Sequence, residues 1–236
     1  MLDLIGAITG MMVIGVILVA FTQALPGTLA RRLALAAIAG AWVGLASGLG
    51  ATGQLAFSPD NPLPLIAVLF AVPLLAVGVA ALRSQSVRAS LLAVPMPLLI
   101  GLNSLRVLGI LFLALAAAGR LSGPFPYFAG IGDIVTGALA VPLAIGFARS
   151  GRAAAAAVRG WNIFGTLDLV VAIGLGLTSA GGGPLQLIHA GVGSAAMQHL
   201  PYCLVPTVLV PFYLIAHGIV AAQLAAARTA PSLAHA

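Results

Sequence analysis

The sequence predicts an all-α integral membrane protein, a bundle of seven transmembrane helices with the N-terminus outside and the C-terminus in the cytoplasm. Three observations lead to this prediction. The chain is 61% hydrophobic and only 6% charged, whereas a soluble domain carries about 25% charged residues. Seven apolar stretches are each long enough to cross a bilayer, which takes roughly 20 residues. The arginines also collect on alternate connections between these stretches, as the positive-inside rule predicts.

The boundaries of the helices follow from polar, Pro-rich or Gly-rich connections between the apolar stretches. The first stretch follows Met-Leu-Asp without a positive charge and exceeds a signal-peptide core, so we expect a retained helix. Pro95 and Pro97 should kink the fourth helix, and Pro206 and Pro211 the seventh. The expected helices cover residues 4–24, 33–57, 63–82, 91–119, 126–148, 161–179 and 202–224.

Two connections are irregular, and no soluble domain is expected. Residues 122–126 read Ser-Gly-Pro-Phe-Pro and predict a tight outer turn. Residues 180–201 contain three consecutive glycines and a mildly apolar run, which predict an outer loop with a short interfacial or re-entrant helix. We therefore expect a single membrane domain over residues 1–226, followed by a short cytoplasmic tail at 227–236.

The distribution of arginine gives the predicted orientation. Eight of the ten arginines fall on the side that would be cytoplasmic, whereas Arg120, Asp3 and Asp60 fall on the opposite side. The chain has no Lys and no Glu and is rich in Ala, which suggests a GC-rich bacterial genome and a bacterial cytoplasmic (inner) membrane. The eight arginines are Arg31, Arg32, Arg83, Arg88, Arg149, Arg152, Arg159 and Arg228.

Four ionisable residues lie inside the predicted helices, where such groups are costly and mark candidate functional sites. At 1.5 Å per residue they all fall within about 8 Å of one level near the midplane. Asn103 and Tyr213 each share a helix face with one of them, at spacings of three and four residues. The candidate substrate or proton site is Arg106, Asn103, Asp133, Asp168, His217 and Tyr213.

The fifth and sixth helices share a local pattern around their aspartates. Residues 130–137 and 165–172 both read Gly-x-x-Asp-aliphatic-Val-x-small. The small residues lie on the face of the aspartate and allow another helix to approach closely. The two antiparallel helices resemble a small inverted pair, which is a construction found in transporters.

The predicted function is a small-molecule or proton-linked transporter, or a ligand-binding membrane protein. Two neighbouring aspartates cannot both ionise cheaply unless a cation lies between them. With Arg106 between Asp133 and Asp168, the group would carry one negative charge, which a proton on His217 would neutralise. A purely structural interpretation stays open, because buried polar groups also lock helices together.

An intramembrane enzyme is an alternative hypothesis. Residues 130–133 read Gly-Ile-Gly-Asp, which resembles the GxGD signature of intramembrane aspartyl proteases and prepilin peptidases. The resemblance implies that Asp133 and Asp168 share a proton and activate water. In those families the partner aspartate precedes the motif, whereas Asp168 follows it. The enzymatic status of the chain is open, and a binding or transport role is favoured.

Other partners and cofactors follow from single residues or their absence. A haem would have His217 as its deep ligand, and an accessory subunit would pack against other membrane proteins or copies of itself. Retinal is excluded because no Lys exists for its Schiff base. Nucleic acid is excluded because the arginines form no basic patch. One cysteine gives no internal disulfide and no thiolate metal cluster, and we expect no metal site.

Overall fold

The computed structural model describes residues 1–57 and 64–229, and every regular element in this part of the chain is helical. Within these ranges, seven helical spans are long and apolar enough to cross a membrane. The all-helical class is therefore confirmed, and the seven apolar helices are compatible with a multi-pass membrane protein. The predicted positions of Asp60 and of most of the tail lie outside the described residues. The spans are Leu2–Ala24 (α1), Leu29–Ala51 (α2), Leu65–Arg83 (α3), Met96–Ala117 (α5, η1 and α6), Phe125–Ser150 (α7), Ala155–Thr178 (α8) and Val205–Ala227 (η4 and most of α9).

Two helices begin earlier than the hydrophobic pattern predicts, because an arginine lies within their first five residues. Helix α2 begins at Leu29 rather than 33, and Thr28 caps it by accepting a hydrogen bond from the backbone N–H of Arg31 at 3.3 Å. Helix α8 begins at Ala155 rather than 161, after a short 3-10 turn. Arg31 and Arg159, which we placed in connections, are thus helical, but both stay near helix ends.

The predicted continuous fourth helix over residues 91–119 is wrong. A separate helix, α4 (Gln85–Leu92), ends before Pro95, and a new helix, α5 (Met96–Leu102), begins after it. Gln223 of α9 donates hydrogen bonds to the carbonyl oxygens of Leu92 and Val94, at 2.9 and 2.7 Å. These bonds satisfy backbone acceptors that the break leaves without helical partners.

The rest of the fourth span also departs from a regular α-helix. A seven-residue 3-10 segment, η1 (Asn103–Gly109), follows α5 and leads into α6 (Ile110–Ala117). The last span begins in a similar way with a π-helical turn, η4 (Val205–Leu209), before α9 (Val210–Thr229). Pro206 lies in this turn and Pro211 in the first turn of α9, where we expected a kink.

The connection over residues 180–201 covers one end of the bundle. Its only helix among the described residues is a four-residue 3-10 turn, η3 (Ala195–Gln198). Ser194 donates its hydroxyl hydrogen to the carbonyl oxygen of Gly176 at 2.6 Å, and Ser122 accepts from the N–H of Gly193 at 2.7 Å. The loop is thereby bonded to the end of α8 and to the turn before α7.

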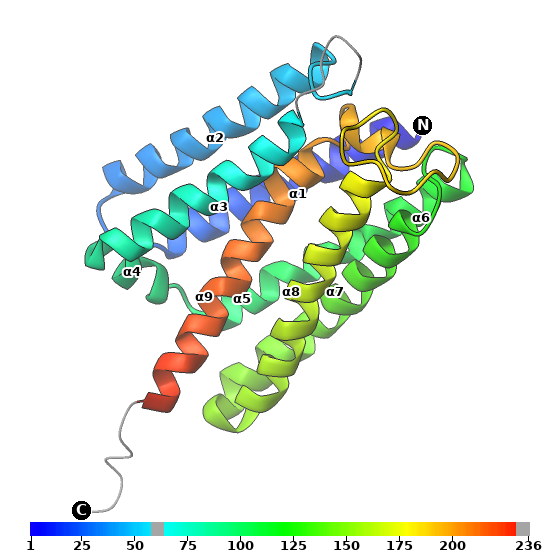
Figure 1. Ribbon diagram of the computed structural model, residues 1–236. Coiled ribbons are helices and arrows are strands. Elements are labelled where there is room, and N and C mark those ends of the chain that lie inside the picture. Colours follow the sequence, from blue (N-terminus) through cyan, green and yellow to red (C-terminus); the bar gives the residue numbers. More distant parts are fainter. Residues whose placement is uncertain (58–63, 230–236) are drawn as a thin grey trace, which may run out of the picture.

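Helix α7 occupies the centre of one half of the bundle, where it contacts α5, η1, α6 and α8. Helix α9 crosses between this half and the half that contains α1, α2 and α3 (Figure 1). The N-terminus lies at the same end as the loop over residues 180–201, and α9 ends at the opposite end (Figure 1). The fold therefore brings η1, α7, α8 and α9 together in the middle of the bundle.

The reactivity of Cys203 tests whether the side chains packed between the helices are shielded from solvent. Its side chain is fully buried, with Sγ against Gly50 of α2, and burial raises the pKa of the thiol to about 11. We expect maleimide to leave the folded protein unlabelled in detergent at neutral pH, because both burial and protonation block the thiol. The same reagent should label the protein after denaturation in dodecyl sulfate. Equal labelling in both conditions would contradict the buried position.

Candidate functional site

Arg106 is the centre of the polar network, and it lies in the 3-10 segment η1 with 3% of its surface exposed. Asn103 begins this segment and donates its side-chain N–H to the carbonyl oxygen of Leu99 at 2.9 Å. The oxygen of the same amide accepts a hydrogen bond from Nη1 of Arg106 at 3.4 Å. Asn103 therefore connects the guanidinium to the backbone of its own span, on the helix face that the three-residue spacing predicted.

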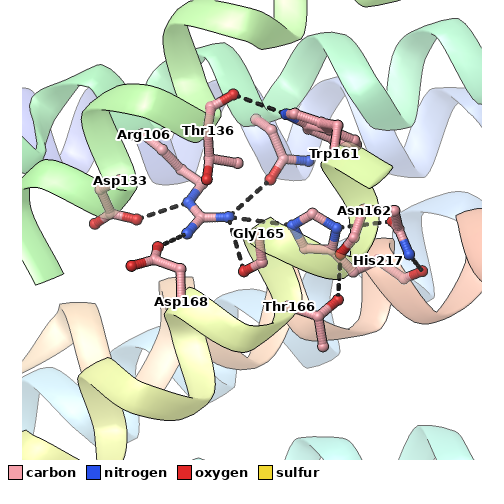
Figure 2. A network of polar contacts seen from close by, with 10 residues as sticks. Arg106, Asp133, Thr136, Trp161, Asn162, Gly165, Thr166, Asp168 and His217 are labelled. Atoms are coloured by element: carbon pink, nitrogen blue, oxygen red, sulfur yellow. Dashed lines mark hydrogen bonds and ion pairs between the residues drawn. The ribbon is translucent and has the colours of Figure 1, made fainter. Parts of the chain in front are cut away.

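The guanidinium pairs with both aspartates along one of its edges. Its Nε donates to Oδ1 of Asp133 in α7 at 2.6 Å, and its Nη2 donates to Oδ2 of Asp168 in α8 at 2.5 Å. Figure 2 shows both carboxylates on one side of the guanidinium. Among the described residues, the other oxygen of each carboxylate accepts no hydrogen bond. Each aspartate thus has one oxygen committed to Arg106 and one free.

Small residues explain how three backbones come close enough for these pairs. A Cβ atom on Gly130 would lie 3.0 Å from the carbonyl oxygen of Gly109 at the end of η1. A Cβ atom on Gly165 would lie 2.7 Å from the ring of His217. Both glycines stand three residues before an aspartate, as the repeated sequence pattern indicated. The pattern therefore marks the tight contacts of α7 with η1 and of α8 with α9.

The other side of the guanidinium faces His217 of α9 (Figure 2). Nη1 of Arg106 lies 3.1 Å from Nε2 of His217 and 3.4 Å from the carbonyl oxygen of Gly165. The second ring nitrogen, Nδ1, lies 2.8 Å from Oδ1 of Asn162, whose amide N–H donates to the carbonyl oxygen of His217 at 3.2 Å.

These contacts define the tautomer of His217. A guanidinium only donates hydrogen bonds, so Nε2 must accept. The Asn162 oxygen only accepts, so Nδ1 must carry the hydrogen. The ring is therefore neutral, and its lone pair is occupied by Arg106. This geometry counts against the hypothesis that His217 takes up a proton, as long as the guanidinium remains beside it.

Tyr213 lies one turn before His217 on the same face of α9. Cζ of Arg106 lies over its ring, 5.6 Å from the ring centroid, which is within the range of a cation–π interaction. Its hydroxyl group is buried and has no hydrogen-bond partner among the described residues. Every candidate site residue from the sequence thus contacts Arg106 or pairs with a residue that does.

Two members of the network were missed from the sequence. Asn162 holds His217, and Trp161 packs against the same ring with centroids 5.0 Å apart. The indole N–H of Trp161 donates to the carbonyl oxygen of Thr136 at 2.9 Å, so this residue is buried rather than an interfacial anchor. An available signal was Asn162 itself, since an amide within a predicted apolar helix requires a partner.

Asp133 borders two partly open cavities in addition to its bond with Arg106. One cavity, of about 80 Å³, lies between α1, η1 and α6 and also reaches Arg106 and Tyr213. The other, of about 60 Å³, extends toward the loop over residues 180–201. Both are lined mainly by apolar side chains. Each is large enough for a few water molecules or a small group of a ligand.

The site does not fit a haem or a metal ion. His217 has no free lone pair to offer iron, because its two nitrogens are bonded to Arg106 and Asn162. Within the described ranges, no group of three His, Cys, Asp or Glu residues is placed to hold a metal ion. Asp133 and Asp168, the pair of the GxGD hypothesis, lie beside each other, and each has one oxygen bonded to Arg106.

Comparison with known proteins places the chain in a family. No curated protein and no solved structure matches it. A family model described as a domain of unknown function, DUF8737, matches residues 63–225, a range that contains every residue of the Arg106 network. The match covers more than half of the sequence, and the chain belongs to this family.

Proposed function

We propose that the protein is a proton-linked transporter of small molecules whose site is the Arg106 network. The observation that carries the proposal is that Asp133 takes part in two different contacts. Its carboxylate pairs with a buried arginine and also borders two cavities. A network that served only to lock helices would be enclosed by side chains on every side. A charged group beside a cavity is instead typical of a substrate or proton pathway.

The charges of the network support a cationic substrate or a proton. With both aspartates ionised, one arginine leaves the group with a single net negative charge. Inside a membrane this charge needs compensation, because isolated ions are poorly solvated there. The free oxygens of the two aspartates are the places where a proton or a ligand cation would supply it.

Two irregular segments would allow the site to change shape. The 3-10 segment η1 carries Arg106, and the π-helical turn η4 precedes the part of α9 that carries Tyr213 and His217. Non-α segments inside long helices often mark functional hinges. We propose that motion at η1 and η4 exposes the aspartates alternately.

We further propose that the chain lies in a bacterial cytoplasmic membrane with its N-terminus outside. Support comes from eight of the ten arginines, which lie near the ends of α3, α7 and α9 and near the beginnings of α2, α4 and α8. These helix ends gather at the end of the bundle opposite to the N-terminus (Figure 1). The positive-inside rule would place that end in the cytoplasm.

Proton flux into proteoliposomes tests the proposed function. The purified protein is reconstituted with a trapped pH-sensitive dye, and a potassium gradient with valinomycin drives proton entry. We expect Asp133→Asn and Asp168→Asn to reduce flux to the level of empty liposomes, because an amide cannot carry the proton. Asp3→Asn is the matched control, since Asp3 pairs with Arg120 at an exposed position outside the network.

Three outcomes would contradict the proposal. One is a wild-type flux no greater than that of empty liposomes. Another is a wild-type rate in both network variants. Loss of flux in the Asp3 variant alone would also place the pathway elsewhere in the bundle.

A further inference from the structure

We infer that a groove between α7 and α8, on the lipid-facing side of the bundle, binds a hydrophobic organic cation whose charged group pairs with Asp168. The inference rests on the proposed function, and it names the substrate class of the same network. It places the binding site on a different face of α7 and α8 from the cavity that extends toward the loop over residues 180–201.

The groove is open to the outside of the bundle and has a volume of about 410 Å³. Its walls are exposed apolar and aromatic side chains, with Phe128 61% and Leu167 58% exposed. In a membrane these residues contact lipid. The lining consists of Tyr127, Phe128, Ile131, Gly132, Phe164, Leu167, Asp168 and Val171.

Asp168 is the charged residue of this lining, and 7% of its side chain is exposed. Oδ2 of Asp168 accepts from Arg106, whereas Oδ1 lies against Gly132 and accepts no hydrogen bond among the described residues. A Cβ atom on Gly132 would overlap with Oδ1. The absence of a side chain at position 132 therefore lets the uncommitted oxygen lie against α7 at the wall of the groove.

Charge complementarity selects the occupant. A lipid tail would leave the extra negative charge of the network unbalanced, and an anion would be repelled. A second copy of the chain would bring no cation to this depth, because Arg106 is buried in its own network. A ligand cation would pair with Asp168, and the rings of Tyr127, Phe128 and Phe164 would offer it cation–π contacts.

The depth of Asp168 requires that this ligand be hydrophobic. Asp168 stands ten residues before the end of α8 at Thr178, which places it about 15 Å from that end of the helix. A ligand reaching the groove must therefore travel within the hydrocarbon. The structure thus favours a membrane-soluble cation over a hydrophilic one.

Tetraphenylphosphonium and tetraphenylborate provide a matched pair of probes, equal in shape and opposite in charge. Binding of each is measured by equilibrium dialysis with the full chain in nanodiscs of zwitterionic lipid, against empty nanodiscs. We expect saturable binding of the cation and none of the anion. Asp168→Asn should weaken cation binding at least about 30-fold, as expected for loss of one partner of a desolvated charge pair.

A second variant distinguishes loss of the groove from loss of stability of the Arg106 network. Leu167→Trp fills the groove without removing a charge, and we expect it to abolish cation binding. Val170→Trp is the control on the same helix, because Val170 is 55% exposed but does not line the groove. This variant should bind like the wild type.

Several results would overturn the inference. Equal binding of both probes, or unchanged cation binding in Leu167→Trp and Asp168→Asn, would show that the groove holds only lipid. If Asp133→Asn still abolishes proton flux in that case, the proposed function stands and the groove assignment alone is wrong. Groove-dependent cation binding with no proton flux would reject proton-linked transport and leave the binding site in place.

Discussion

Replacing Arg106 by Gln is expected to destabilise the protein more than any other single substitution in the network. The change leaves two buried carboxylates without their shared cation. The net charge of the network with both aspartates ionised then changes from −1 to −2. Removing one partner of a buried ion pair costs about 3–5 kcal/mol in free energy of unfolding. Asp133→Asn and Asp168→Asn should cost less, because each leaves one aspartate paired with Arg106 and a network without net charge.

Unfolding in mixed micelles of mild detergent and dodecyl sulfate measures this order of stability. The triple variant Arg106→Gln, Asp133→Asn, Asp168→Asn removes all three charges, and we expect it to recover part of the stability lost in Arg106→Gln. The exposed pair of Asp3 and Arg120 is the control, and Arg120→Gln should cost less than about 1 kcal/mol. The explanation from charge is wrong if Arg106→Gln is no less stable than the two aspartate variants.

The second large effect is expected from Gly137→Ala in α7. A Cβ atom at this position would lie 2.6 Å from the backbone nitrogen of Val107 and 3.1 Å from the carbonyl carbon of Arg106. Backbone atoms cannot rotate away as a flexible side chain does, so η1 must shift. We expect a loss of about 1–3 kcal/mol from overpacking, together with reduced proton flux, because the shift displaces Arg106.

Gly146→Ala provides the matched control in the same helix. No neighbouring atom lies within 4 Å of a Cβ atom placed there. Alanine is the better helix former by about 1 kcal/mol, so this variant should be as stable as the wild type or slightly more stable. Both variants are compared by thermal unfolding in detergent. Equal stability of the two alanine variants would show that η1 and α7 are not in tight contact.

The sequence predicts the spans well because their hydrophobicity and length are local properties. It also predicts which residues meet. Charged residues inside a membrane pair with one another, and the depth of each follows from the helical rise per residue. Arg106, Asp133, Asp168 and His217 were placed at one level by counting residues. The structure brings them into one network of hydrogen bonds.

What the sequence does not predict depends on contacts between distant segments. The break before Pro95 is stabilised by Gln223, more than a hundred residues later. The tautomer of His217 depends on Asn162. Asn162 is uncharged, so a search for ionisable residues in the apolar helices does not include it. The position of the Asp168 carboxylate depends on the absence of a side chain at Gly132 of the neighbouring helix.

The helical type of η1 has a mechanical consequence. A 3-10 helix rises about 2.0 Å and turns about 120° per residue, whereas an α-helix rises about 1.5 Å and turns about 100°. Rewinding the seven residues of η1 into an α-helix would shorten the span by about 3.5 Å and turn Arg106 by roughly 60° relative to the start of the segment. The guanidinium would then leave both carboxylates while α7 and α8 stay still, so a change of pitch in one short segment is enough to uncouple the charges.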